Sequence, residues 1–301
     1  MADKTCSSKG WVDNTTTAVL YPTDVKTHVL NIDSRFRDHS QSVSSTDFMI
    51  KLPRTYKNVI GVRLSSIEIP NTWYTFTCAR GNTAIKVNNL VSYIPDGNYT
   101  PTQLAASAES AIQTAAGDAN TTVAFSSVTG KITISNSTDG LSLEFGTSPS
   151  CGDCLSAASS LIPYNGGLGY QLGFTGTSYG GNSTFTGEYI VDTMRDTYVL
   201  LQLPELEMLM DSFTYGNTSI KAFAKIIIDQ DKYNLVYDSG ANTVSKQIQF
   251  PQPVNMSTFR VRLVDAYGLP MDLMADFSIT LEISEVVNSK TYEAYRNSLT
   301  C

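Results

Sequence analysis

Three runs of apolar residues, cut by polar turns, begin the patterned part of the chain. They span His28–Ile32, Asp47–Leu52 and Val59–Ile69. Each run alternates apolar with polar positions, as a half-buried β-strand does. Within the third run the alternation slips, because Val62 and Leu64 fall on one parity and Ile67 on the other. A slip of one residue sends side chains to the opposite face, so we expect a β-bulge, or a strand that passes between two sheets, at Ser65-Ser66.

Strand signals return after residue 190 and are longer there. The runs are Tyr198–Leu203, Lys221–Asp229, Tyr233–Tyr237, Lys246–Phe250, Ser257–Leu263 and Asp276–Ile283. Pro251 and Pro253 fall between two of these runs, where a proline costs a sheet nothing, since it cannot donate to the ladder. With the first three runs the total comes to about eight antiparallel strands, the number typical of a single jelly roll built from two sheets.

The intervening stretch has a different pattern and predicts a small α+β subdomain. Thr100 is an expected N-cap, Pro101 takes the first helical position, Gln103 completes a capping box, and Gly117 ends the helix. The apolar stripe of this helix consists of Leu104, Ala108, Ala111, Ile112 and Ala115. Because the stripe is narrow and rich in alanine, we expect the helix to lie close on a sheet. The expected strands are Ala84–Val87, Val123–Phe125, Ile132–Ile134 and Leu141–Phe145.

These patterns give a mainly β protein, a single antiparallel jelly-roll sandwich interrupted once by an α+β insert. The predicted boundaries are an N-terminal arm at 1–24, a discontinuous jelly roll at 25–77 and 190–285, an insert at 78–189, and a C-terminal tail at 286–301. The arm is polar, with Trp11 and Tyr21 as isolated aromatic residues, and is either free or ordered against a neighbouring subunit. The aromatic residues that follow the third strand, Trp73, Tyr74 and Phe76, are expected to plug the core.

Composition and charge narrow the classes of function. The formal net charge is −7, which argues against a surface that neutralises nucleic-acid phosphates. No apolar run approaches ~20 residues, so we expect no transmembrane segment, and the first residues do not resemble a signal peptide. The 5 cysteines are odd in number and scattered, which predicts no disulfide framework.

The residues with chemical potential do not form a recognisable catalytic or metal site. The 2 histidines, His28 and His39, lie in a strand and in a polar turn, and nothing in the sequence marks either of them as part of a catalytic centre. Cys151 and Cys154 have C-x-x-C spacing inside a Gly/Ser-rich loop, without the second ligand pair of a zinc site. A phosphate-binding loop, a dinucleotide fingerprint and a metalloprotease motif are also missing. The sequence therefore predicts no enzyme and no cofactor.

Two sets of residues remain as candidate surfaces. Asp33, Arg35, Arg37 and Asp38 alternate in charge within the segment NIDSRFRD. They either pair across a subunit contact or form ion pairs at a strand end, worth ~0–1 kcal/mol where exposed. The second set consists of Tyr164, Tyr170, Phe174 and Tyr179, in or near the Gly-rich part of the insert. It would form a shallow aromatic site if the insert bound a receptor or a glycan.

Several segments resemble minor virion proteins of the nucleocytoplasmic large DNA viruses. They are VLNIDSRFRD (29–38), DFMIKLP (47–53), NVIGVRLSSIEIPNTWYTF (58–76), IPDGNYTPTQL (94–104), FSSVTGKITI (125–134), LGYQLGF (168–174) and FPQPVNMSTFRVRLVDAYGLPMDLMADFSITLEI (250–283). The resemblance thus covers most of residues 28–283, and its motifs are structural rather than catalytic.

The resemblance implies a capsid protein. Within the family, the member with a single jelly roll and an inserted subdomain resembles the penton, whereas the major capsid protein has two jelly rolls. A chain of 301 residues has room for one jelly roll and the insert. The resemblance therefore implies a homopentamer at the vertices of an icosahedral virion, made in the host cytoplasm, with the major capsid protein and other minor capsid proteins as partners. Another minor capsid protein, which cements or lines the shell, and a receptor- or glycan-binding vertex module are the alternatives.

Overall fold

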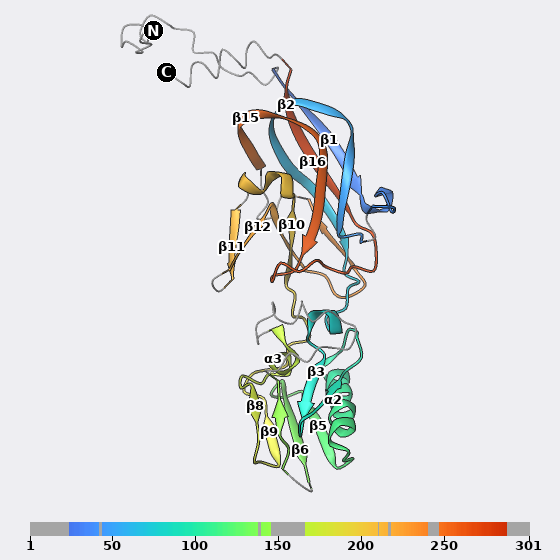
Figure 1. Cartoon of the computed structure of the whole chain (residues 1–301), viewed down its shortest axis with the longest axis vertical. Helices are drawn as coiled ribbons and strands as arrows, with labels where there is room; N and C mark the ends of the chain where they lie inside the picture. Colours follow the sequence, from blue (N-terminus) through green and yellow to red (C-terminus); the bar gives the residue numbers. More distant parts are fainter. Residues whose placement is uncertain are drawn as a thin grey trace, which may run out of the picture. The chain divides into compact units, whose positions relative to one another are not determined.

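The computed structural model describes residues 24–41, 44–137, 140–145, 166–209, 211–215, 218–239 and 247–287 (Figure 1). The chain divides into two compact units, a sheet unit of Met1–Thr72 with Tyr198–Cys301 and an inserted unit of Trp73–Thr197. Residues 73–77 and 190–197, which the sequence pattern predicts to be part of the jelly roll, belong to the inserted unit. Within the described ranges, no helix is long and apolar enough to cross a membrane.

The sheet unit is built on one antiparallel sheet of seven strands, which curls strongly (Figure 1). Its strands are β1 (Val25–Asp33), β2 (Asp47–Pro70), β10 (Tyr198–Gln202), β13 (Ala224–Ile227), β14 (Leu235–Asp238), β15 (Gln247–Val264) and β16 (Ser278–Val286). The order is β1-β16-β2-β15-β10-β13, and β14 also pairs with β2. A separate hairpin joins β11 (Asp211–Tyr215) to β12 (Thr218–Ala222), and two 3-10 helices, η2 (Ser34–Phe36) and η5 (Pro204–Leu209), complete the unit.

Two pairs of predicted strands are each one long strand in the structure. The runs 47–52 and 59–69 are both parts of β2. The described part of the run 246–250, from Gln247, and the run 257–263 are both parts of β15. Pro251 and Pro253 therefore lie within a strand, which corrects the prediction. They are tolerated there because the pairing of β15 with β2 shifts register between Gln249 and Val254, where a proline breaks no ladder hydrogen bond.

The run 221–229 was predicted to be one strand, and this is wrong, because the structure divides it between β12 and β13. The break falls at Phe223, whose side chain is buried and whose backbone N–H donates to the carbonyl of Leu201 at 2.7 Å. The strand is interrupted where the ring of Phe223 is buried. The hairpin strand β11 was not predicted.

The expected bulge lies at Ser65. In the pairing of β16 with β2, Thr280 lies opposite Ser66 and Leu281 opposite Leu64, so Ser65 is the additional residue. The bulge changes the parity at which side chains face the core, and Leu64 and Ile67 are consequently both buried. The slip in the sequence pattern is thus explained, and the prediction of a bulge is confirmed.

The described residues of the inserted unit form one long helix, two small sheets and several short elements (Figure 1). Its strands are β3 (Ala84–Val87), β4 (Leu90–Tyr93), β5 (Thr121–Ser126), β6 (Lys131–Asn136), β7 (Leu143–Glu144), β8 (Ser178–Tyr179) and β9 (Thr184–Thr186). They form the antiparallel sheets β4-β3-β7-β8 and β5-β6-β9. The helices are α2 (Pro101–Ala116), the short α3 (Leu168–Gln171) and the 3-10 helix η3 (Cys78–Arg80).

Helix α2 follows its predicted signals closely. The side chains of Thr100 and Gln103 form the capping box, Pro101 is the first helical residue, and Gly117 caps the end with φ of 63°. All five residues of the predicted apolar stripe are buried. Trp73 and Phe76 are also buried, as expected of a core plug. The predicted class, mainly β with an antiparallel jelly-roll-like fold and an α+β insert, is confirmed; the correction is that seven strands share one curled sheet.

One cysteine departs from the sequence-based expectation. Cys78 is disulfide-bonded, although the odd number of cysteines predicted no disulfide framework. Of the other cysteines, Cys151 and Cys154 lie outside the part of the chain that the structure describes, and the same holds for Cys6 and Cys301.

A polar cluster around Glu285 of β16 joins this strand to β1 and β2. The Glu285 carboxylate accepts hydrogen bonds from Arg54 Nη2 at 2.7 Å and from the backbone N–H of Lys57 at 3.0 Å, and it lies 2.8 Å from His28 Nε2. The Arg54 guanidinium also stacks 4.1 Å from the centroid of the Tyr56 ring. These bonds stabilise the ionised carboxyl, chiefly through Arg54, and lower the pKa of Glu285 to about 2.

We therefore expect Glu285→Gln to destabilise the sheet unit by about 1–2 kcal/mol at neutral pH, after screening by solvent. Because the folded pKa lies below the ordinary value of 4.5, this stabilisation is present above about pH 4.5 and is lost as the pH falls toward 2. Urea unfolding of both proteins between pH 7 and pH 2 measures it. Glu282→Gln on the same strand is the control, since Glu282 only meets Arg63 at 3.8 Å. If the difference in unfolding free energy between the wild type and Glu285→Gln stayed the same at low pH, the ionised Glu285 carboxyl would not be the source of the stabilisation.

Candidate interaction surface around Asp33 and Asp276

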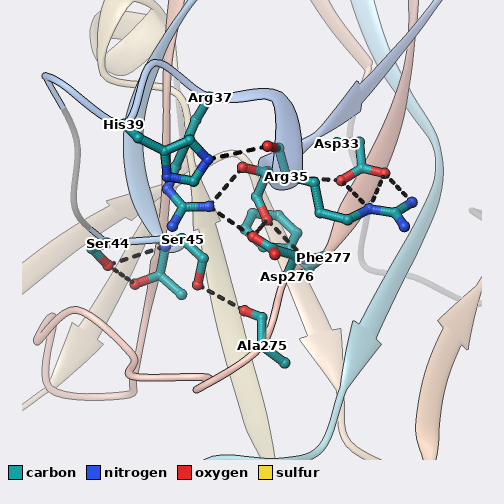
Figure 2. A network of polar contacts seen from close by, with 11 residues as sticks. Asp33, Arg35, Arg37, His39, Ser44, Ser45, Ala275, Asp276 and Phe277 are labelled. Carbon is teal, nitrogen blue, oxygen red and sulfur yellow. Dashed lines mark hydrogen bonds and ion pairs between the residues drawn. The ribbon is translucent and has the colours of Figure 1, made fainter.

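The charged segment predicted as a candidate site forms the turn that follows β1. Asp33 has extended backbone, caps η2 and accepts a hydrogen bond from the Arg35 N–H at 2.9 Å. The Arg35 guanidinium returns to the same carboxylate, with Nη2 at 2.6 Å and Nε at 3.0 Å (Figure 2). Hydrogen bonding from Arg35 holds the pKa of Asp33 below its usual value. The Arg35 side chain is 68% exposed, so this pair contributes little to stability.

Arg37 has a different partner, Asp276, which precedes β16. Arg37 Nη1 donates to Asp276 Oδ1 at 2.7 Å and to the carbonyl of Ser34 at 2.8 Å (Figure 2). The buried Ser34 donates to the same Asp276 oxygen at 2.7 Å and accepts from the Phe277 N–H at 3.0 Å. Asp276 therefore fixes η2 against the start of β16. Its distance along the chain hid it from sequence analysis, which offered no local signal for this pair.

Asp38 stands apart from both ion pairs. It accepts hydrogen bonds from the backbone N–H of Ser40 at 3.0 Å and from its hydroxyl at 2.6 Å, which lower the pKa of Asp38. This is the turn chemistry typical of aspartate. The ring of His39 lies 3.3 Å from the carbonyl of Arg35, still within the same exposed turn. Among the four predicted residues, Asp33 and Arg35 pair with each other.

Two open hollows adjoin this turn. One, of about 530 Å³, is lined by Arg37, Ser44, Ser45, Met274 and Asp276 among others. The other, of about 340 Å³, is lined by Asp33, Arg35, Glu68, Leu235 and Asp276 among others.

Large apolar side chains are exposed beside the charges, including Phe36 at 81%. Aromatic residues, methionine and arginine are enriched at protein–protein contacts, which makes this turn a candidate for one. In the ranges that the structure describes, no group of three His, Cys, Asp or Glu side chains is placed to hold a metal.

The aromatic residues predicted on the insert surface separate into core and surface. Phe174 is fully buried and stacks on Phe145 with ring centroids 5.1 Å apart, so its assignment to a surface is wrong. Tyr179 packs edge-on against Phe174 at 5.1 Å, and its hydroxyl contacts Glu188 at 2.9 Å. Burial raises the pKa of Tyr179. Only Tyr170, 39% exposed, keeps a surface position, and Tyr164 lies outside the described residues.

The burial of Phe174 follows from the packing of α3. Leu168, Leu172 and Phe174 all enter the core of the inserted unit. Gly169 lies so close to Phe145 that a Cβ atom added to Gly169 would stand 2.4 Å from the Cβ atom of Phe145. Glycine is required at this approach, and it lets the apolar island LGYQLGF close over the small sheets. The sequence spacing alone could not tell this arrangement from a surface cluster.

The class that these features define is a jelly-roll-like β protein with an inserted α+β unit. No protein-family model matches the chain, and no curated protein matches it. Among solved structures, the penton protein of mavirus matches with a TM-score of 0.46 and 9% sequence identity, over 87% of this chain and 100% of that chain.

Proposed function

We propose that the protein is a structural virion protein, a penton that closes the five-fold vertices of a large icosahedral capsid. The observation that carries the proposal is the way the family-like segments meet. VLNIDSRFRD forms β1 and η2, DFMIKLP and the segment after it form β2, and the C-terminal segment contains most of β15 and β16. These strands are neighbours in the order β1-β16-β2-β15, so the resemblance covers one contiguous part of the sheet.

A ring of such subunits would form through head-to-tail contacts. Contacts of this kind close into a ring when the rotation from one subunit to the next is a whole fraction of a full turn. The turn at Asp33, Arg35 and Arg37 is our candidate for part of that contact, since its ion pairs lie beside exposed apolar side chains. The arm and the tail would reach the major capsid protein and other minor capsid proteins. Individual contacts would be weak, and repetition around the ring would supply avidity.

The competing functions receive less support. A glycan-binding site built on the insert aromatics would need Phe174 at the surface, and Phe174 is buried. A cementing or shell-lining capsid protein shares the fold requirement and differs in its place in the particle. A role without catalysis is part of the proposal, because the charged groups of Asp33 and Asp276 are held in ion pairs with Arg35 and Arg37.

Labelling of intact particles tests the proposal. We expect antibodies against the inserted unit to label the five-fold vertices in electron micrographs of purified virions. Label along the facets would replace the penton role with that of another minor capsid protein. Label only in disrupted particles would place the epitope inside the shell. Absence of the chain from purified virions would overturn the capsid role altogether.

A further inference from the structure

A row of side chains crosses four adjacent strands on the outward face of the sheet unit. Tyr237 of β14 lies opposite Glu68 of β2, Ser278 of β16 lies opposite Glu68, and Asp33 of β1 lies opposite Ser278. The residues before these in β14, β2 and β1 are the buried Val236, Ile67 and Ile32. Because side chains alternate along a strand, the row points away from the core.

Glu68 is the carboxylate of this row whose charge is not balanced within the described part of the chain. It accepts hydrogen bonds from the hydroxyls of Ser66, at 3.1 Å, and of Ser278. The nearby guanidinium groups are committed elsewhere, Arg35 to Asp33 and Arg37 to Asp276. The two serines hold the Glu68 carboxylate in a fixed orientation, which prepares it for a cation from outside the chain.

An exposed apolar wall stands beside this carboxylate. Leu235 is 54% exposed and Tyr237 59% exposed, and they are alternate residues of β14 on the same face as Glu68. Pro70 lies opposite Leu235 and extends the wall. Glu68, Pro70 and Leu235 line the 340 Å³ hollow together with the ion-paired Asp33, Arg35 and Asp276, so the wall and the charge share one concave surface. We call Glu68, Pro70, Leu235 and Tyr237 the Glu68 face.

We propose that the Glu68 face binds an arginine side chain presented by a neighbouring capsid protein. Arginine satisfies both halves of the face, because its guanidinium pairs with a carboxylate and stacks on an aromatic ring, while its aliphatic stem covers apolar surface. Lysine has a more strongly hydrated charge and fits the Tyr237 side less well. That the neighbour is a capsid protein rests on the proposed function. That it presents an arginine rests on the residues of the Glu68 face.

Selection of a random peptide library on the immobilised full-length protein tests the chemistry without particles. We expect the enriched peptides to carry an arginine beside apolar residues. Calorimetric titration of the best peptide should show affinity roughly five- to tenfold lower for Glu68→Gln and for Tyr237→Ala. Glu282→Gln is the matched control, because it removes a carboxylate of β16 that lies near Arg63 of β2, and this variant should bind as the wild type does.

The proposal is overturned if the selection enriches no basic residue, or if Glu68→Gln binds the peptide with unchanged affinity. Replacing the peptide's arginine with lysine should weaken binding, and equal binding would overturn the assignment to arginine. Thermal unfolding of each variant checks its fold, and Leu235→Ser replaces Glu68→Gln if the latter unfolds. A negative result in these binding experiments would not change where antibodies label the particle, so the arginine site and the penton role can be rejected independently.

Discussion

Replacing Phe174 with alanine is expected to destabilise the inserted unit by about 3–5 kcal/mol, enough to unfold much of it. Phe174 is fully buried and lies among the rings of Phe145 and Tyr179, so its removal leaves a cavity that the short strands around it cannot fill. Hydrogen exchange of the α2 amides measures the effect, because this helix packs in the same buried cluster. We expect its protection to be largely lost.

Tyr170→Ala is the control for this substitution. Tyr170 belongs to the same apolar island, but its side chain is 39% exposed, and we expect a change within about 0.5 kcal/mol. If Phe174→Ala kept full protection in α2 while altering binding to a glycan array, the aromatic residues would be a recognition site and the assignment to the core would be wrong.

Local signals predicted local structure well. The start and end of α2 depend on Thr100, Gln103 and Gly117, all of which act within a few residues of the backbone groups they cap. The bulge at Ser65 was visible because a buried strand must keep its apolar side chains on one face. Such rules need no knowledge of the partner strand.

Features that depend on distant partners were missed. The pair between Arg37 and Asp276 joins residues that only the pairing of β1 with β16 brings together. The continuity of β15 through Pro251 and Pro253 depends on where its register with β2 shifts, which the chain's own pattern does not encode. Phe174 and Tyr170 are similar in sequence context, and their different exposure depends on how closely α3 approaches Phe145.

The same distinction explains why the candidate surface was predicted only in part. Asp33 and Arg35 pair over two residues, within reach of sequence reasoning. Glu68 lies in an apolar strand and gave no signal, because its partners on the outward face come from β14 and β16. A surface that spans four strands becomes visible only when their register is known, and register in turn depends on the bulge in β2.

Deletion of Ser65 is therefore expected to abolish the cooperative folding of the sheet unit. Without the additional residue, Ile67 and Ile69 would turn to the outward face and the charged Glu68 toward the core, unless β2 slips against both of its neighbours. Exposing two buried isoleucines and burying an unpaired carboxyl group together cost about as much as the 5–15 kcal/mol that stabilises a typical protein. Near-ultraviolet circular dichroism and urea unfolding would detect the loss.

Ser65→Ala is the matched control, because it keeps the additional residue and changes only a partly exposed side chain. We expect it to unfold within about 0.5 kcal/mol of the wild type. The comparison separates the bulge from the serine, since only the deletion changes the parity of the residues that follow. A deletion variant that unfolds cooperatively, with wild-type stability, would mean that some other feature decides which face of β2 meets the core. The outward position of Glu68 would then lose its physical explanation.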